Sequence, residues 1–247
     1  ARLVIGNNDE DHWVSEQGPF SARRFKNLPE QGWTLLAQTV DQWIPEVAEL
    51  LEHFTFLPRW RIDDVMISYA TLGGGGGPHF DQYDVFLLQT SGEREWRLGQ
   101  RCDDNSSLRE DCNLKLLTEF NETERHVLQP GDMLYVPAGL AHWGTAVSDD
   151  CVTVSIGFRA PSVAELLRHS IDTLAEQLPE SQRYRDSEQT LAAGPREISE
   201  AVAEQLLSYY EQLPRDTIKQ ALAQAFGELV TEPRNAEMIK NEKDWTD

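Results

Sequence analysis

The chain contains, just past its middle, the stretch Gln129-Pro130-Gly131-Asp132-Met133-Leu134-Tyr135-Val136-Pro137-Ala138-Gly139-Leu140-Ala141-His142. Residues 130–132 and 137–139 have the proline and glycine composition of turns, and residues 133–136 form a short apolar run between them. Comparable β-type runs lie at 65–69, 83–89, 95–98 and 152–158. Short strands separated by turn residues are typical of a barrel or jelly roll, so we expect a mainly β fold over this region.

Helical patterns flank the β-rich region on both sides. We expect a helix over residues 33–44, where apolar residues recur with helical spacing until Pro45. On the far side, Ser162 and Glu165 have the spacing of a capping box, in which each side chain accepts a hydrogen bond from the other residue's backbone N–H. A helix is therefore predicted to begin at Ser162.

Apolar residues continue at three- and four-residue steps over 198–213 and 218–229, which predicts further amphipathic helices. We divide the chain into a barrel domain with N-terminal helical elements (1–161) and a helical domain (162–247) with a loose polar end from residue 233. The apolar helix faces need a partner, and the pattern leaves open whether it is the barrel, another helix or a second copy of the chain.

The charge balance excludes one large class of partners. The 247 residues include 22 Lys and Arg against 42 Asp and Glu, a formal net charge of −20, whereas nucleic-acid backbones are bound mainly by clustered cations. No apolar run is long enough to span a membrane. A basic protein partner would be attracted, although acidity also aids solubility or suits a salty habitat.

The cysteines favour a reducing compartment. Cys102, Cys112 and Cys151 are odd in number and lack the C-x-x-C spacing of thiolate zinc sites. We therefore expect three free thiols and a cytoplasmic protein. The chain begins at Ala1 without an initiator methionine or a signal-peptide pattern, which suggests a piece of a longer protein.

A glycine-rich segment introduces the first chemical motif. Five glycines at 73–77 precede Pro78-His79-Phe80-Asp81. Glycine permits close backbone approach or a sharp bend, as at a barrel mouth or a moving lid. If 79–81 is extended, His79 and Asp81 point to the same side. Such a pair is also common as an ordinary hydrogen-bonding pair, so by itself it is a weak indication of a metal site.

Combined with the opening stretch, this motif becomes specific. The spacing from Gly131 to His142 matches the second cupin motif, and the spacing from Gly73 to His79 matches the start of the first. Asp81 stands where ordinary cupins usually have a second histidine, and apolar residues stand where they have a glutamate. His79, Asp81 and His142 then form the two-histidine, one-carboxylate set of non-haem Fe(II) oxygenases, unless His142 is only a core histidine.

The open coordination positions of such an iron would accept a 2-oxo acid and dioxygen. If the cosubstrate is 2-oxoglutarate, its distal carboxylate needs a buried cation. We expect Arg94 to serve, because period two places it on one face with Trp96 and Leu98. The alternatives are a surface Arg94 paired with Glu93 or Glu95, and Lys115 as the anchor.

The run at 62–70 supplies a second set of candidates. Asp64, Met66, Ser68 and Ala70 share one face, while the opposite face is apolar enough to be core. An inward Asp64 would receive a cationic substrate side chain, whereas an outward Asp64 would be one solvated carboxylate among many. Tyr83 would stack on a planar cation or simply fill the barrel.

Three stretches extend the resemblance beyond cupins in general. Residues 61–68, 79–86 and 157–161 are similar to those of the JmjC-type, cupin-fold ribosomal oxygenases, and the likeness covers nearly the whole chain. It implies a double-stranded β-helix (jelly-roll) barrel followed by an α-helical region that forms a homodimer. It also implies hydroxylation of an arginine in large-subunit ribosomal protein sixteen. From the resemblance we expect no counterpart of the family's C-terminal winged-helix-like domain after Phe226, and a shortened N-terminal segment.

The same resemblance assigns roles to individual residues. Iron would be bound by His79, Asp81 and His142, 2-oxoglutarate by Arg94 and Ser68, and the substrate arginine by Asp64, Met66, Tyr83 and Ser155. The hypothesis is thus an Fe(II)- and 2-oxoglutarate-dependent protein hydroxylase that uses dioxygen. Its rivals are a non-catalytic metal-binding cupin module and an iron oxygenase of a small molecule. The donor set also leaves Mn, Co, Ni or Zn open.

Overall fold

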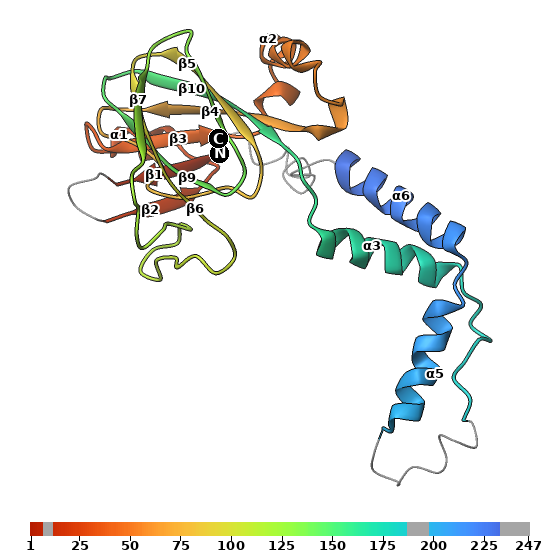
Figure 1. Cartoon of the computed structure of the whole chain (residues 1–247). Coiled ribbons are helices and arrows are strands. Elements are labelled where there is room, and N and C mark those ends of the chain that lie inside the picture. Colours follow the sequence, from red (N-terminus) through yellow and green to blue (C-terminus); the bar gives the residue numbers. More distant parts are fainter. Residues whose placement is uncertain (7–11, 187–197, 233–247) are drawn as a thin grey trace. The chain divides into compact units, whose positions relative to one another are not determined.

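The computed structural model describes residues 1–6, 12–186 and 198–232, and the chain divides into two compact units, Ala1–Ala160 and Pro161–Asp247. The first unit contains two antiparallel sheets (Figure 1). The larger sheet contains, in spatial order, β2 (Val14–Gln17), β1 (Arg2–Ile5), β3 (Trp33–Ala37), β4 (Ile62–Ala70), β10 (Cys151–Phe158), β5 (Val85–Ser91) and β8 (Met133–Val136). The smaller contains β7 (Glu124–Leu128), β6 (Arg94–Arg101) and β9 (Leu140–Ala146).

Apolar side chains join the two sheets into a barrel. Leu87 of β5 and Val136 of β8 pack in one buried cluster with Trp96 and Leu98 of β6. Side chains on alternate positions of each strand point into this interior. The architecture is the double-stranded β-helix that the sequence predicted, and the strand at 133–136 has the predicted bounds.

Short helical segments cover part of the outer face of the larger sheet, over β4, β10 and β5. They include η1 (Val40–Gln42), α2 (Pro45–Glu49) and η2 (Leu50–Phe54), while η3 (Arg59–Arg61) leads directly into β4 and α1 (Ala22–Lys26), between β2 and β3 in the chain, has no buried residue. Leu51 and Phe54 of η2 bury Val65 of β4 and Ile156 of β10. These segments therefore cover one face of β4, and the opposite face is turned to the barrel interior.

The helix expected at 33–44 is wrong. Residues Trp33–Ala37 form β3, which pairs with β1 on one edge and β4 on the other, as in Leu3↔Leu35↔Tyr69. The apolar spacing fits either structure over so short a length, and the two neighbouring strands decide for the strand. Pro45 begins α2 instead of ending a helix, since its fixed φ suits a first helical position. Strands β1, β2, β7 and β9 were also missed.

The second unit is helical, as predicted. It contains α3 (Val163–Glu176), α5 (Glu200–Glu211) and α6 (Arg215–Thr231), and α3 packs against α6. The capping box at the start of α3 is present, with Glu165 N donating to Ser162 Oγ at 3.1 Å. The loose end expected from residue 233 lies outside the described residues. None of the described helices is long and apolar enough to cross a membrane.

Candidate active site

Three donor groups from two segments of the chain converge inside the first unit. His79 and Asp81 follow the glycine segment, and His142 lies on β9. One ligand atom from each lies within 4.8 Å of the others, and within the described residues this is the one such cluster of three. His142 is 3% exposed, and His79 and Asp81 are partly buried. The three donor groups therefore face the interior of the unit.

Backbone hydrogen bonds bring the two histidines together. His79 N donates to His142 O at 3.1 Å and His142 N donates to His79 O at 2.8 Å, so the pair forms an isolated antiparallel bridge. The backbone of Asp81 is held by Gly139, whose N–H donates to Asp81 O at 2.8 Å. The segment 79–81 is not a regular strand, since only His79 forms a bridge. The turn at 137–139 therefore orients both His142 and the approaching carboxylate.

Both imidazoles present the nitrogen that a metal would need. His79 Nδ1 lies 2.9 Å from Gly77 O, and His142 Nδ1 lies 3.0 Å from Leu140 O. A carbonyl oxygen only accepts hydrogen bonds, so each Nδ1 is placed to donate, and Nε2 is the ring nitrogen left to face a metal. Carbonyl partners of this kind orient ligating histidines in metal sites. The donor set thus fits a divalent transition metal with open positions.

The His142 ring stays neutral in the metal-free protein. Burial lowers the pKa of His142 to about 4, the nearby His79 acts in the same direction, and Asp81 opposes both. The 3.6 Å approach of His142 Nε2 to Asp81 Oδ2 is therefore not an ion pair at neutral pH. Neutral imidazole is the form that binds metals, so no proton has to leave His142 first.

This shift predicts a specific acid sensitivity. Unfolded His142 has a pKa of about 6.5, so between pH 6.5 and 4 the unfolded chain binds a proton that the folded chain rejects. Stability contributed by His142 is complete above pH 6.5 and falls by roughly 3 kcal/mol as the pH drops to about 4. Urea unfolding of the metal-free protein at several pH values measures this fall. The His142→Gln variant should lose that part of the slope, whereas exposed His126→Gln should keep it.

The glycine segment serves close backbone approach. Gly75 pairs with Thr145 in an isolated bridge, and a Cβ on Gly75 would collide with the carbonyl oxygen of Gly144. A Cβ on Gly74 would collide with the carbonyl oxygen of Trp33 in the same way. The segment before His79 is thus packed directly on neighbouring strands, which explains why side chains are missing there.

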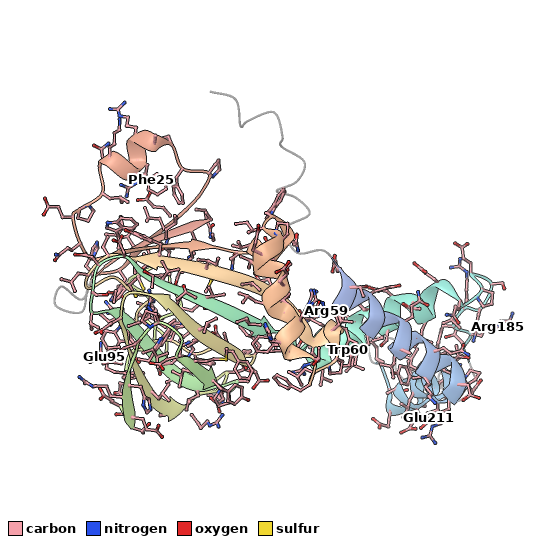
Figure 2. All side chains as sticks on the ribbon, turned by 90° about the horizontal axis from the view of Figure 1, so that it is seen from above. Phe25, Arg59, Trp60, Glu95, Arg185 and Glu211 are labelled. Atoms are coloured by element: carbon pink, nitrogen blue, oxygen red, sulfur yellow. The ribbon has the colours of Figure 1, made fainter. Side chains whose placement is uncertain are left out.

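Arg94 points inward, as its place on β6 predicted. It is 3% exposed, and its sequence neighbour Glu95 lies at the outer surface of the barrel (Figure 2). The Nε of Arg94 donates to Cys151 Sγ at 3.4 Å, while its Nη2 is buried without a hydrogen-bond partner among the described residues. In the part of the chain that the structure describes, no ion pair joins Arg94 to a carboxylate. Lys115, the alternative anchor, is exposed.

Ser68 lies on the same interior surface. It is 3% exposed, and its hydroxyl donates to Thr153 O at 3.3 Å across the β4–β10 pair. Cys151, the neighbour of Arg94, pairs with Ala70, two residues along β4 from Ser68. The two residues assigned to one carboxylate by resemblance therefore lie on adjoining parts of the barrel wall.

The residues assigned to the substrate also come together. Met66 and Ser155 are direct partners in the β4–β10 register. Asp64 Oδ1 and Tyr83 Cε2 each lie 3.7 Å from the point where a Cβ on Gly157 would stand. Gly157 thus leaves open the space between a carboxylate and an aromatic ring. We did not single out Gly157 as a site residue, although it belongs to one of the stretches that carry the resemblance.

A second residue missed at the sequence level holds Asp64. Thr39 N donates to Asp64 Oδ2 at 3.0 Å, and Thr39 has φ 55, a left-handed conformation that is unfavourable for a β-branched side chain. Backbone strain of this kind is concentrated at functional sites. The sequence around Thr39 does not indicate its left-handed backbone conformation, because the carboxylate that accepts from Thr39 N belongs to Asp64, on the distant strand β4.

These features define a cupin-type double-stranded β-helix whose interior carries a two-histidine, one-carboxylate metal site. Residues 49–166 match the model of the JmjC domain family.

Comparison with known proteins identifies relatives that are named as oxygenases or hydroxylases of the ribosome. A probable ribosomal oxygenase of Haemophilus influenzae is 42% identical over 168 residues, 68% of this chain and 41% of that protein. The ribosomal protein uL16 3-hydroxylase of Escherichia coli is 34% identical over 238 residues, 95% of this chain and 61% of that protein. A solved E. coli ribosomal oxygenase with cobalt and 2-oxoglutarate matches with a TM-score of 0.75 and 34% identity, covering 94% of this chain and 59% of that one. The chain thus spans between about two and three fifths of these relatives.

Proposed function

We propose that the chain is the catalytic part of an Fe(II)- and 2-oxoglutarate-dependent protein hydroxylase. One observation carries the proposal: the His79, Asp81 and His142 donors share a barrel with Arg94, a buried cation whose Nη2 meets no hydrogen-bond partner in the described part of the chain. A metal site alone would suit a binding module. This enzyme class also needs a buried cation that binds the distal carboxylate of 2-oxoglutarate, and the guanidinium of Arg94 can meet that need.

His79, Asp81 and His142 would hold Fe(II) and leave positions open. When bound, Fe(II) supplies the activation of dioxygen, coupled to oxidation of 2-oxoglutarate to succinate and carbon dioxide. Arg94 and Ser68 would both bind the distal carboxylate of 2-oxoglutarate through charge-assisted hydrogen bonds, because the acceptor is ionised. Trp96 and Leu98, buried on the same face as Arg94, exclude water from this carboxylate and strengthen its attraction to the guanidinium.

We propose an arginine side chain of a ribosomal protein as the substrate. The name of the E. coli relative gives ribosomal protein uL16 as the substrate of that enzyme. In this chain Asp64 would pair with the guanidinium and Tyr83 would stack on its plane, with Met66 and Ser155 beside the methylene stem. A Cβ on Gly157 would stand 3.7 Å from both Asp64 Oδ1 and Tyr83 Cε2, in the space that the guanidinium would occupy.

Several broader assignments complete the proposal. A net charge of −20 attracts basic ribosomal proteins and disfavours direct binding of nucleic acid. Three free cysteines suit a cytoplasmic protein. We propose residues 1–161 as the catalytic domain and residues 162–247 as a homodimerisation region. The exposed apolar side chains Val163, Leu167 and Ile171 at four-residue steps along α3 support the latter.

The direct test is reconstitution with Fe(II) under nitrogen, followed by air, 2-oxoglutarate and a peptide from the basic ribosomal protein. We expect the peptide to gain one oxygen atom, roughly 16 Da, with an equal amount of succinate. Succinate without a mass gain would keep the oxygenase class and reject this substrate. Neither signal from iron-loaded protein would reject the enzyme and favour a non-catalytic cupin module.

The carboxylate of Asp64 should decide peptide affinity. Asp64→Asn keeps an oxygen that accepts from Thr39 N but removes the charge, so we expect the KM for the peptide to rise by about tenfold or more. The KM for 2-oxoglutarate should stay the same. Asp63→Asn, which changes the neighbouring carboxylate on the other face of β4, is the matched control. Equal effects of the two variants would contradict the assignment.

A further inference from the structure

A chain of neutral, fully buried polar groups surrounds the Nε edge of Arg94. Cys151 Sγ accepts from Arg94 Nε at 3.4 Å and from Gln89 Nε2 at 3.3 Å. The Thr153 hydroxyl in turn donates to Gln89 Oε1 at 2.8 Å. Gln89 and Cys151 are 0% exposed and Thr153 is 1% exposed. No solvent competes for these contacts, so each of them restricts where the guanidinium can lie.

Gln89 also fixes the turn from which the Arg94 strand starts. Its Nε2 lies 2.7 Å from Ser91 O and 3.2 Å from Gly92 O, so one side-chain amide bridges both the turn and Cys151. Gly92 has φ +63, and a Cβ there would stand 2.9 Å from Cys151 Cα. The turn is therefore pressed against Cys151 on one side and tied to Gln89 on the other. Arg94 begins β6 directly after it.

The chemistry of this surround suits an anion-binding arginine. A guanidinium has several N–H edges, and contact of Nε with sulfur leaves the Nη edge for a planar carboxylate. Sulfur is a weak acceptor, so it orients the group without neutralising its charge. A carboxylate in place of Cys151 would form an ion pair with Arg94 and compete with any incoming anion. Ala70 and Ala146 pack around Cys151 and leave room for the guanidinium.

We propose that Cys151 and Gln89 are positioning residues that hold Arg94 for the distal carboxylate of 2-oxoglutarate. The inference rests on the proposed function, because it concerns the affinity of the same cosubstrate. It concerns neither the metal ligands nor the substrate pocket. Removing the sulfur should therefore weaken 2-oxoglutarate binding and leave metal binding as it was.

The test uses the full chain loaded with Mn(II) under nitrogen and titrated calorimetrically with 2-oxoglutarate. Cys151→Ala should weaken 2-oxoglutarate binding about three- to tenfold, the range for one lost hydrogen bond. Cys151→Ser should stay within about twofold of the unmodified protein, because a serine oxygen accepts from the same two donors. Gln89→Met should weaken binding in the same direction as Cys151→Ala. Mn(II) affinity should be equal in all of them. With Fe(II), Cys151→Ala should raise the KM for 2-oxoglutarate and leave kcat unchanged.

The outcomes separate the two proposals. If the unmodified protein holds Mn(II) but does not bind 2-oxoglutarate, the proposed function fails and this inference fails with it. If the unmodified protein binds and Cys151→Ala binds equally well, only the positioning role is overturned. A parallel loss of Mn(II) affinity in Cys151→Ala would also overturn it, since that result means general disruption of the barrel. Equal weakening by Ala and Ser would exclude the hydrogen bond to Nε.

Discussion

The Asp81→Ala variant is expected to show no measurable hydroxylation and to lose metal affinity by at least about 100-fold. Even the outer partners of metal ligands cost 10- to 100-fold when removed, and Asp81 supplies one of only three donors. The remaining His79 and His142 present two neutral nitrogens without a negative charge to balance a divalent cation. Equilibrium dialysis with Mn(II) and succinate release with Fe(II) measure the two effects separately.

The matched control for this variant is Asp104→Ala. Asp104 is an exposed carboxylate outside the donor cluster. It accepts a hydrogen bond at 3.0 Å from Nε2 of Gln82, the residue that follows Asp81 in the chain. We expect it to keep full metal affinity and turnover. Unchanged turnover in Asp81→Ala would contradict the proposal that His79, Asp81 and His142 bind the catalytic metal, whatever the result for Asp104→Ala.

Replacing Arg94 by methionine should raise the KM for 2-oxoglutarate by at least about 100-fold. A bidentate carboxylate contact comprises two charge-assisted hydrogen bonds, each of roughly 1.5–3 kcal/mol, and methionine keeps most of the side-chain volume without either of them. Arg94 is 3% exposed, so solvent cannot replace the lost donors. Steady-state kinetics at increasing 2-oxoglutarate, with anaerobic titration of the Mn(II) form, measure the loss.

Lys115→Ala tests the alternative anchor. Lys115 is exposed on the loop between β6 and β7, so we expect less than about a twofold change in the KM for 2-oxoglutarate. A large effect of Lys115→Ala together with a small effect of Arg94→Met would reverse the assignment. Metal affinity should be the same in both variants, because neither side chain belongs to the donor cluster.

Local patterns predicted the parts of this protein that depend on neighbouring residues. Glycine and proline at 130–132 and 137–139 determine turns through their own backbone preferences, and these turns present His142. Alternation along 94–98 placed Arg94, Trp96 and Leu98 on one face, and all three are buried. The capping box at Ser162 and Glu165 is likewise complete within four residues.

Tertiary structure decided whatever depends on strands that are distant in the chain. Residues 33–37 form a strand because β1 pairs with one of its edges and β4 with the other. Both partners are distant in the chain, so the local sequence pattern does not reveal them. The contact of Arg94 with Cys151 joins residues 57 apart, and that of Gln89 with Cys151 joins residues 62 apart. Register between strands sets such contacts, and a shift of one residue would turn every side chain to the other face. The sequence by itself therefore determined the donor types and the turns that present them, whereas only the packed barrel decided which neutral groups surround the buried cation.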